Sequence, residues 1–427
     1  MKILWITNIL FPDICKELGI SAPVTGGWMH SSAMALQKCG SNIDLAVASL
    51  YSGRELKVSK INGITYYCLP SSFQSSYIKK NLYRLFGNQN TYDRKLEEHW
   101  RQIKNAFQPD VVHIHGTEFT HGLAYLRSCG SENVVASIQG LVSVIARYGD
   151  GLVSKELKRN RTLIDYIHPS LEKQFCRRGI FEQEYLERLK YIIGRTDWDK
   201  VHALAVNPGL KYFFHNETLR SEFYDHSWDI HQCERHSIFL SQAASPIKGI
   251  HFVIKALPYI IGKYPDVKVY VGGRDITSKK GLENKLKFTA YPKYVCSLIK
   301  RLNLEKYFVF LGALDEKNMV QRYLKTHIFI CPSTIENSPN SLGEAQLLGV
   351  PSVASYVGGI PNMIVDGASG LLYRCEEHEM LADQVCRIFD NDDLALHLST
   401  EGKKVASERH DRKKNALRLC EIYREII

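Results

Sequence analysis

The sequence contains no run of about 18 uninterrupted apolar residues, which is the length that a membrane-spanning helix needs. The longest candidate, residues 134–146, is too short and includes Gln139, so any membrane contact is expected to be peripheral. The apolar run at residues 3–6 is too short for a secretory signal peptide, and no small-residue cleavage site follows it. None of the 11 cysteines stands at CxxC spacing, which excludes zinc ribbons and thioredoxin-type motifs.

Low-complexity tracts are absent as well, and the composition is that of a folded globular protein. Of 427 residues, 44% are apolar and 23% charged, and this length predicts two or three domains. The dispersed cysteines are typical of reduced, mostly buried thiols in a cytoplasmic protein. A net charge of +10 favours anionic partners, among them nucleotide-sugars, phospholipid surfaces and nucleic acid, without choosing between these classes.

Apolar runs of strand length alternate with helical patterns in two separate stretches of the chain. Such alternation is typical of a parallel sheet with helices on both faces. We therefore predict an α/β protein with two doubly wound halves that join near residues 207–235, followed by an amphipathic helix in residues 411–427. The expected strands are residues 3–6, 43–48, 64–68, 111–115 and 134–138 in the first half, and 237–241, 267–271, 307–311, 327–331 and 351–355 in the second.

Two carboxylates, Glu336 and Glu344, bracket a turn-rich stretch that leads from an expected strand into a helical pattern beginning at Glu344. Free N–H groups and the positive end of a helix dipole make such a strand-to-helix loop a binding site for phosphate. For an isolated pair of this spacing, the alternative is that Glu344 is only a first-turn acid that stabilises the start of the helix.

The pair belongs to an ordered set of motifs between about residues 237 and 372. They are FLG at 310–312, CPS at 331–333, GVPSVA at 349–354, GGIP at 358–361 and DGASGLL at 366–372. This set resembles the donor-binding half of the family 4 glycosyltransferases, which are retaining enzymes with the GT-B fold. The N-terminal half is similar, more loosely, to bacterial capsule and lipopolysaccharide members, through Pro12, Gly26, Gly27 and residues 110–116, 138–141 and 194–199.

The resemblance implies two Rossmann-like domains facing across a cleft. Residues 1–206 would form the acceptor-binding domain and residues 207–410 the nucleotide-sugar domain, with the helix in residues 411–427 crossing back to the N-terminal domain. A dehydrogenase is excluded, because GxGxxG is absent after the first expected strand.

The resemblance also implies roles for individual residues. The two predicted catalytic residues are Glu336, which would orient the hydroxyls of the donor sugar, and Lys248, which would neutralise the leaving diphosphate. Glu344 would accept hydrogen bonds from the ribose hydroxyls. The remaining predicted donor-binding residues are Asn340, Ser341 and Leu342 at the helix start, Gly26 and Gly27 at the diphosphate, Leu311 and Gly312 at the base, and Gln242 and Arg274.

The sequence departs from the family pattern at three places. Relatives usually have an arginine shortly before the lysine at position 248, but residues 241–245 contain none, and Arg274 would compensate for it. Pro339 replaces a small residue and has no N–H to donate. Gln139 stands where many relatives have a histidine, and it can bond a sugar hydroxyl but cannot change charge near pH 7.

Further chemistry-bearing residues lie in the N-terminal half. His115 and Glu118, at the end of an expected strand, are predicted together with Gln139 to contact the acceptor or the sugar, with structural packing as the alternative. The triplet at residues 197–199, Asp-Trp-Asp, is interpreted as a helix start capped by Thr196 and not as a metal site. No metal and no cofactor beyond the nucleotide-sugar is expected.

These features together predict a retaining glycosyltransferase. It would transfer a hexose or N-acetylhexosamine from a nucleotide-sugar, UDP-linked in preference to GDP-linked, to a sugar hydroxyl of a growing lipid-linked glycan in surface polysaccharide synthesis. The basic, aromatic residues 77–86 are the better candidate for contact with the anionic inner face of the plasma membrane, with a core helix that has a basic rim as the alternative. Residues 154–195 are more typical of a solvated face on charge-rich helices, with contact to an anionic surface as the alternative. Nucleic acid is not an expected partner. The alternative is a non-catalytic GT-B scaffold in a glycan-assembly complex.

Overall fold

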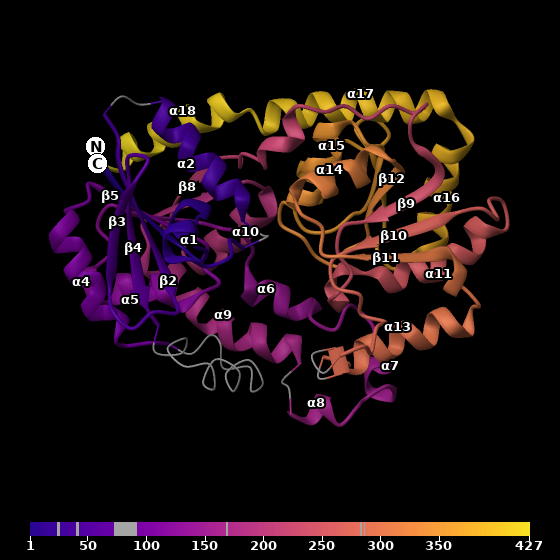
Figure 1. Ribbon diagram of the computed structural model, residues 1–427, viewed down its shortest axis with the longest axis horizontal. Coiled ribbons are helices and arrows are strands. Elements are labelled where there is room, and N and C mark those ends of the chain that lie inside the picture. The colour runs from indigo at the N-terminus through magenta and orange to yellow at the C-terminus, as the bar shows by residue number, and fades with distance from the viewer. Residues whose placement is uncertain (24–25, 40–41, 72–91, 168–169, 282–283, 286) are drawn as a thin grey trace. The chain divides into compact units, whose positions relative to one another are not determined.

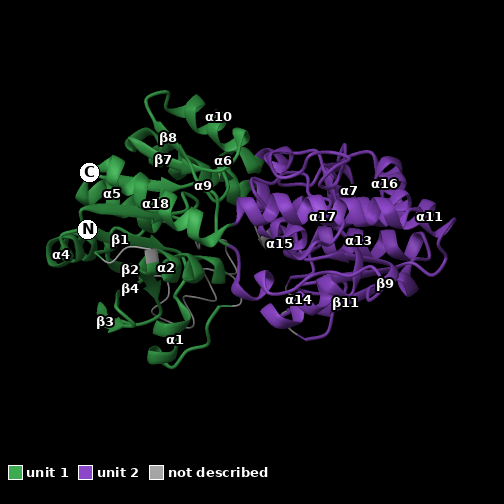
Figure 2. Ribbon diagram, turned by 90° about the horizontal axis from the view of Figure 1, so that it is seen from above, with its two compact units in different colours: residues 1–146, 173–218, 411–427 green, residues 147–172, 219–410 purple. Residues whose placement is uncertain are grey.

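The computed structural model describes residues 1–23, 26–39, 42–71, 92–167, 170–281, 284–285 and 287–427. The chain forms two compact units, shown in green and purple in Figure 2. Unit 1 consists of residues 1–146, 173–218 and 411–427, and unit 2 of residues 147–172 and 219–410. The basic stretch at residues 77–86, which we expected to contact a membrane, lies outside the described residues.

These boundaries differ from the expected ones in two places. Unit 1 continues to Thr218, beyond the expected end at residue 206, and residues 147–172 belong to unit 2. The second difference has a local cause, because Asp165 accepts a hydrogen bond at 3.0 Å from the backbone N–H of Ala290, the first residue of a unit 2 helix.

Unit 1 is built on an eight-stranded sheet in the order β3-β4-β2-β1-β5-β6-β7-β8. β3 pairs antiparallel with β4, and the other neighbours pair in parallel. The four first-half strands expected within residues 3–6, 43–48, 64–68 and 111–115 are confirmed, and the fifth ends at Ser137. The strands are β1 (Lys2–Thr7), β2 (Asp44–Tyr51), β3 (Lys57–Ile61), β4 (Ile64–Pro70), β5 (Val111–His115), β6 (Val134–Ser137), β7 (Tyr191–Gly194) and β8 (Lys211–Phe214).

Helices cover both faces of this sheet (Figure 1), as the alternation of strands and helices predicts. They are α1 (Pro12–Leu18), α2 (Gly27–Cys39), α4 (Leu96–Phe107), α5 (Thr120–Cys129), α6 (Val142–Ile145), α9 (Leu171–Arg188), α10 (Asp197–Val206) and α18 (Arg412–Ile426), with a 3₁₀ turn at Ala146–Tyr148. Residues 3–6 of β1 are fully buried, which is why this strand reads as a continuous apolar run.

The C-terminal helix α18 packs against α2 and is part of unit 1. Its Tyr423 is buried, and the Tyr423 hydroxyl accepts a hydrogen bond from the indole N–H of Trp5 at 2.9 Å. The same hydroxyl lies 2.6 Å from Nδ1 of His113 on β5. The amphipathic pattern of residues 411–427 thus corresponds to a helix whose apolar face completes the core of unit 1.

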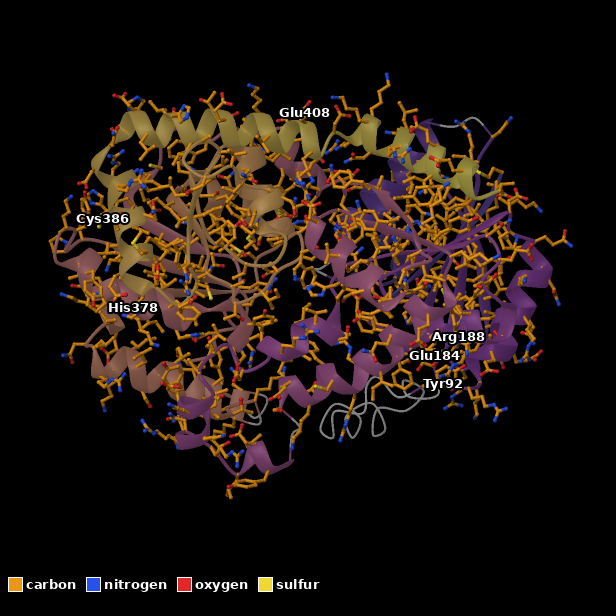
Figure 3. The ribbon with its side chains drawn as sticks, turned by 180° about the vertical axis from the view of Figure 1, so that it is seen from behind. Tyr92, Glu184, Arg188, His378, Cys386 and Glu408 are labelled. Atoms are coloured by element: carbon orange, nitrogen blue, oxygen red, sulfur yellow. The ribbon has the colours of Figure 1, made fainter. Side chains whose placement is uncertain are left out.

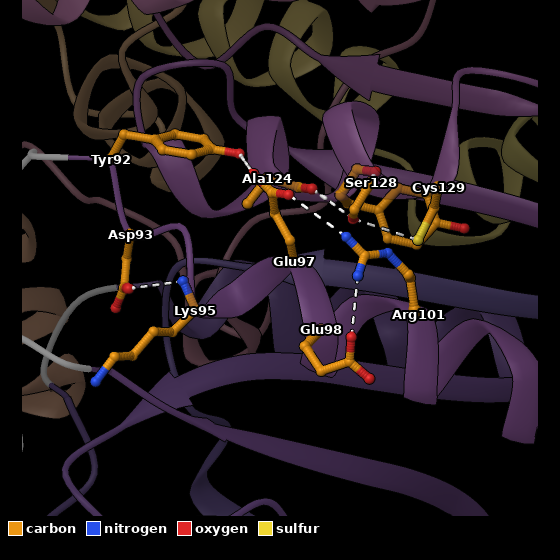
Figure 4. A network of polar contacts seen from close by, with 10 residues as sticks. Tyr92, Asp93, Lys95, Glu97, Glu98, Arg101, Ala124, Ser128 and Cys129 are labelled. Atoms are coloured by element: carbon orange, nitrogen blue, oxygen red, sulfur yellow. Dashed lines mark hydrogen bonds and ion pairs between the residues drawn. The ribbon is translucent and has the colours of Figure 1, made fainter.

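The surface of unit 1 carries hydrogen bonds and ion pairs that lie outside this apolar core. Figure 4 shows the hydroxyl of Tyr92 donating to Glu97 at 2.6 Å and Arg101 paired with Glu98 at 2.9 Å. On α9, Arg188 pairs with Glu184 at 2.7 Å (Figure 3). Exposed pairs of this kind contribute about 0–1 kcal/mol each, so burial of the sheet and helices dominates the stability.

Unit 2 is built on a six-stranded sheet in the order β11-β10-β9-β12-β13-β14, in which all neighbours pair in parallel. Its strands are β9 (Glu234–Leu240), β10 (Lys268–Gly272), β11 (Phe308–Gly312), β12 (Thr326–Cys331), β13 (Ser352–Ser355) and β14 (Leu371–Tyr373). The sequence predicted five of them, and the fold class of two doubly wound α/β halves is confirmed.

The helices of unit 2 are α7 (Ser154–Arg159), α8 (Ile164–Ile167), α11 (Ile250–Ile261), α13 (Ala290–Arg301), α14 (Glu316–Leu324), α15 (Asn340–Leu348), α16 (His378–Asp390) and α17 (Asp392–Arg409), with 3₁₀ turns η2 (Ser221–Tyr224), η3 (Pro246–Lys248), η4 (Glu305–Tyr307) and η5 (Ile360–Asn362). Most helices of unit 2 follow one of its strands, whereas α7 and α8 precede β9 in the chain and α17 follows α16 directly. Among the described residues, no helix is both long and apolar enough to cross a bilayer.

Candidate functional site

The turn between β12 and α15 carries the strongest sequence motif and lies at the carboxyl edge of the unit 2 sheet. Because parallel strands end at the same edge, the loops that follow β9, β10, β11 and β12 meet there. Two glycines allow this close approach. At Gly249 (φ 70°) a side chain would collide with the carbonyl of Pro332, and at Gly358 (φ 51°) with the carbonyl of Glu336.

Lys248 and Glu336, the two predicted catalytic residues, form an ion pair. Nζ of Lys248 lies 2.6 Å from Oε1 of Glu336, which also accepts a hydrogen bond from the hydroxyl of Ser333 at 2.7 Å. Burial opposes the charge on the ammonium group, but the adjacent carboxylate outweighs it, and the pKa of Lys248 is raised. The side chains are 28% and 14% exposed, so the pair is accessible at the edge of the sheet and not sealed in the core.

Glu344 lies in the second turn of α15, because that helix begins at Asn340 and not at Glu344. The alternative that Glu344 stabilises the first turn is therefore wrong. Its carboxylate forms a bidentate ion pair with Arg220, with Nε–Oε1 and Nη2–Oε2 distances of 2.7 and 2.8 Å. Burial raises the pKa of Glu344, and Arg220 acts in the opposite direction. No motif in the sequence marks Arg220, which lies 124 residues away in the expected join between the domains.

The start of α15 presents the groups that an anion site needs. The first N–H groups of a helix have no partner within it, and Asn340 and Ser341 supply them here from half-buried positions. The hydroxyl of Tyr323 fixes the turn by donating to the carbonyl of Ser341 at 2.9 Å. The side chain of Leu342 is fully buried, which leaves only its backbone to contact a ligand.

The other predicted donor-binding residues of unit 2 lie at the same edge of the sheet. Gln242 follows β9 and is exposed, and Arg274 follows β10 and is half-buried. Leu311 and Gly312 end β11, where the N–H of residue 273 bonds the carbonyl of Gly312 at 2.9 Å. The structure thus brings these residues to one edge, whereas their contacts with a nucleotide stay predictions.

The unit 1 candidates lie at the carboxyl edge of the other sheet. Gly26 has a φ of 86°, which a glycine adopts readily, and Gly27 begins α2. His115 ends β5, with its ring 4.4 Å from that of Trp5 and stacked at 3.9 Å on that of His113. Burial lowers the pKa of His115 to about 3, so the ring is neutral. Neither ring nitrogen has a hydrogen-bond partner among the described residues.

Glu118 lies in the loop after β5, with its carboxylate against the backbone of Gly116. Burial raises the pKa of Glu118 to about 7, partly opposed by Arg178 and Arg195. Its Oε2 atom has no hydrogen-bond partner in the described part of the chain. A buried, unpaired acceptor at the carboxyl edge of a parallel sheet is suited to a ligand hydroxyl.

Gln139 follows β6 and is held by an ion pair that the sequence analysis missed. Its amide donates to Oε1 of Glu217 at 2.8 Å, and Glu217 pairs with Arg195. The guanidinium of Arg195 also donates to the carbonyl of Ile138 at 2.7 Å. Arg195 belongs to the motif at residues 194–199 that carries the resemblance, but no sequence pattern links it to Glu217. Gln139 is consequently fixed in orientation.

The Asp-Trp-Asp triplet is a helix start, as predicted. The hydroxyl of Thr196 caps α10 by accepting a hydrogen bond from the N–H of Asp199 at 3.1 Å. The Asp199 carboxylate accepts hydrogen bonds from the hydroxyl of Tyr212 at 2.6 Å and from the N–H of Arg195 at 3.0 Å. Within the described ranges, no group of three or more His, Cys, Asp or Glu side chains is placed to hold a metal ion.

Comparisons with known sequences place this motif set in a family. The family described as glycosyl transferases group 1 matches residues 230–405. A D-inositol 3-phosphate glycosyltransferase of Corynebacterium urealyticum is 28% identical over 183 residues, which cover 42% of this chain and 41% of that protein. Spore coat protein SA of Bacillus subtilis is 23% identical over 265 residues, which cover 61% of this chain and 63% of that protein. Both alignments thus span less than two thirds of the relatives' lengths.

Solved structures resemble the whole chain. Sucrose-phosphate synthase from Thermosynechococcus elongatus superposes with a TM-score of 0.71 at 15% identity, covering 100% of this chain and 99% of that one. Anabaena HepE, solved in complex with UDP and glucose, gives a TM-score of 0.63 at 15% identity, with both chains fully covered. The two Rossmann-like units therefore have the GT-B fold. Residues 230–405 match the glycosyl transferases group 1 family, and the predicted resemblance to family 4 glycosyltransferases is confirmed.

Proposed function

We propose that the protein is a retaining glycosyltransferase that moves a hexose or N-acetylhexosamine from a nucleotide-sugar to a hydroxyl group of a growing glycan. The observation that carries this proposal is the Lys248–Glu336 pair, in which the lysine lies in η3 after β9 and the glutamate lies in the turn leading to the N-terminus of α15. A cation, a carboxylate and a helix N-terminus at one sheet edge combine the groups that bind a sugar diphosphate and stabilise its departure.

Each part of the donor has a proposed partner in unit 2. The diphosphate binds at the N-terminus of α15, where N–H groups and the helix dipole favour negative charge. Glu344 accepts hydrogen bonds from the ribose, and Leu311 and Gly312 contact the base. UDP in preference to GDP is the proposed carrier, and the structure of HepE in complex with UDP and glucose supports this choice.

The proposed reaction exchanges one bond at the anomeric carbon for another. The bond to the diphosphate oxygen breaks while a bond to the acceptor oxygen forms on the same face, and the acceptor proton passes to the leaving diphosphate. Lys248 stabilises the charge that develops on this leaving group, while Glu336 orients the sugar hydroxyls. No nucleophilic side chain and no metal are part of this scheme.

For the acceptor we propose the edge of unit 1 that carries His115, Glu118 and Gln139. His115 is neutral, and Glu118 and Gln139 offer hydrogen-bonding oxygen and nitrogen atoms, a set that suits sugar hydroxyls. The proposed acceptor is a lipid-linked glycan in surface polysaccharide synthesis. The name of the relative spore coat protein SA is compatible with assembly of a surface layer.

Contact with an anionic membrane is a further part of the proposal. Residues 154–166 of unit 2 expose the cations Lys158, Arg159 and Arg161 beside the apolar side chains of Leu163 and Tyr166. Cations next to exposed apolar groups favour the interface of an anionic bilayer. The proposed location is therefore the cytoplasm, with peripheral contact at the inner face of the plasma membrane.

A panel of nucleotide-sugars tests the proposed function. Purified protein is incubated with UDP- and GDP-linked hexoses and N-acetylhexosamines, and release of the nucleoside diphosphate and the anomeric configuration of any transferred sugar are measured. We expect turnover with at least one donor and retained configuration. Inverted products would refute the retaining mechanism, and binding of the nucleotide without turnover of any donor would favour the scaffold alternative.

A further inference from the structure

Glu344 has a partner, Arg220, that no sequence motif marked. The pair is bidentate, with two nearly parallel N–H···O bonds of 2.7 and 2.8 Å between largely buried side chains. We infer that Arg220 is a positioning residue, which holds the Glu344 carboxylate in the orientation that accepts hydrogen bonds from both ribose hydroxyls of the donor nucleotide. This inference rests on the proposed function, since it concerns the same nucleotide site.

Arg220 is itself held firmly. Its guanidinium lies 4.7 Å from the ring centroid of Phe223, a fully buried residue of η2. Two hydrogen bonds fix the turn: the N–H of Glu222 donates to Glu316 on α14 at 3.0 Å, and the hydroxyl of Tyr224 donates to the carbonyl of His410 at 2.7 Å. Because Phe223 and the fixed turn hold the arginine in place, its side chain loses little further conformational entropy when a ligand binds. The Glu344 carboxylate is therefore preorganised.

The geometry leaves Glu344 able to bind a second partner. A carboxylate has about four acceptor positions, two on each oxygen, and the fork of Arg220 uses one on each. One acceptor position on each oxygen therefore remains, which matches the two adjacent hydroxyls of a ribose. The bidentate pairing requires an arginine at position 220, because the single ammonium group of a lysine could not bond both carboxylate oxygens of Glu344 in a fixed geometry.

The charges around Glu344 make the arginine necessary for ionisation as well. Burial and the nearby Glu316 raise the pKa of Glu344, and the hydrogen bonds and charge of Arg220 lower it. Tyr323 on α14 also faces the pair, and His410 faces the adjacent Gly343 of α15. Without Arg220, the carboxylate would take up a proton at a higher pH and lose acceptor capacity.

Nucleotide discrimination tests this role. Dissociation constants of UDP, GDP and ADP and of their 2′,3′-dideoxy forms are measured by calorimetry at pH 6, 7.5 and 9, for wild type, Arg220→Met, Arg220→Lys and Glu344→Gln. The matched control is Arg322→Met, which removes another Arg–Glu pair of unit 2, to Glu234 at the start of β9. That pair is away from the carboxyl edge of the sheet.

We expect the wild type and the control to prefer the ribose form of the bound nucleotide by about tenfold or more at all three pH values. In Arg220→Met this preference falls and becomes pH-dependent, being smallest at pH 6 and rising toward pH 9 as Glu344 ionises. Arg220→Lys lies between and serves as the test protein if the methionine variant does not fold. In Glu344→Gln the preference falls to the same extent at every pH, because the amide keeps only one acceptor oxygen and cannot ionise.

The outcomes separate this inference from the proposed function. A wild-type preference that survives in Arg220→Met without pH dependence overturns the positioning role and leaves the donor site intact. Wild-type binding without any ribose preference overturns the inference for both residues, while turnover with nucleotide-sugars still supports the transferase. Failure of all three nucleoside diphosphates to bind overturns both.

Discussion

Nζ of Lys248 lies 2.6 Å from Oε1 of Glu336, although 88 residues separate the two in the chain. The lysine follows β9 in a 3₁₀ turn, and the glutamate follows β12, the neighbouring strand of the sheet. Parallel pairing therefore brings the two loops together at the carboxyl edge. The two residues form one charged unit, so that changes at either position are expected to act through the other.

We expect Lys248→Ala and Glu336→Gln each to lower kcat for sugar transfer by about 100-fold, because each removes charge stabilisation or positioning at the proposed reacting centre. The double variant is expected to lose little more than either single variant, since the residues act as a pair. Steady-state kinetics checks this. Lys263→Ala, which removes an exposed pair with Asp390, is the control and should keep full activity. Folded Lys248→Ala protein with undiminished transfer would contradict the assignment.

The buried carboxyl group of Glu118 is expected to make the free energy of unfolding depend on pH. Burial raises its pKa to about 7 in the folded protein, so between about pH 4.5 and 7 the folded state holds more protons than the unfolded state. The contribution of Glu118 to the free energy of unfolding is therefore largest below about pH 4.5, and it is lost as the pH rises to about 7. The shift corresponds to about 3 kcal/mol.

The measurement is urea unfolding of wild type and Glu118→Gln from pH 4 to 9. The difference between the two proteins isolates Glu118 from the buried His113, His115 and His121, whose pKa values are lowered and whose contributions have the opposite sign. We expect the wild type to lose stability relative to the variant as the pH rises. A difference that stays constant across this range would contradict the raised pKa.

The sequence predicted ten strands, among them the four-residue β6 and β13, and missed β3, β7, β8 and β14. β1 reads as a buried parallel strand because residues 3–6 are apolar without interruption. β7 and β8 have only four residues each, and Lys211 and Phe214 at the ends of β8 are exposed, so its apolar signal is weak. The helix α15 was predicted to begin too late, because Pro339 and the polar residues after it resemble a loop.

Only the candidate site residues that stand in local sequence motifs could be predicted. Glu336 and Glu344 stand in one motif and Lys248 in another, and the family resemblance connects them. The partner of Glu344, in contrast, comes from a segment that has no periodicity of its own, and ion pairs between distant segments leave no local pattern. The same limit applies to residues 147–172, whose place in unit 2 depends on packing of α7 against α13.

Substitutions of Thr196 and Asp199 are expected to lower the stability of unit 1, and sugar transfer is expected not to depend on a metal ion. Thr196→Ala removes the N-cap of α10 and is expected to cost about 1 kcal/mol. Asp199→Asn weakens the bonds from Tyr212 and the backbone of Arg195 and should also destabilise unit 1. Denaturant unfolding measures both effects. Transfer by the wild type should be equal with EDTA and with added Mn²⁺, whereas activity that requires Mn²⁺ and is lost in Asp199→Asn would support the metal-site alternative.

Residues 154–166 expose apolar side chains and cations next to one another. Leu163 and Tyr166 are 85% and 74% exposed, a large exposure for apolar side chains beside several cations. The exposed Lys285 and Lys287 precede α13 in the chain, and the first N–H of that helix is bonded to Asp165, so they add positive charge within a few residues of this contact. Anionic vesicles are therefore expected to bind the protein in two ways, by charge and by insertion of the two apolar side chains.

Co-sedimentation with vesicles separates these two contributions. Binding should be strong with phosphatidylglycerol vesicles, weak with phosphatidylcholine vesicles, and reduced by raising the salt from 0.05 to 0.5 M, because salt screens the cations. Leu163→Ser with Tyr166→Ser should weaken binding about tenfold or more at either salt concentration, since the apolar contribution does not depend on screening. The control replaces two exposed apolar residues elsewhere in unit 2, Tyr259→Ser with Leu396→Ser, and should bind as the wild type does. If the control loses as much binding as the first pair, the contact is not specific to this surface, and residues 154–166 are only a solvated face.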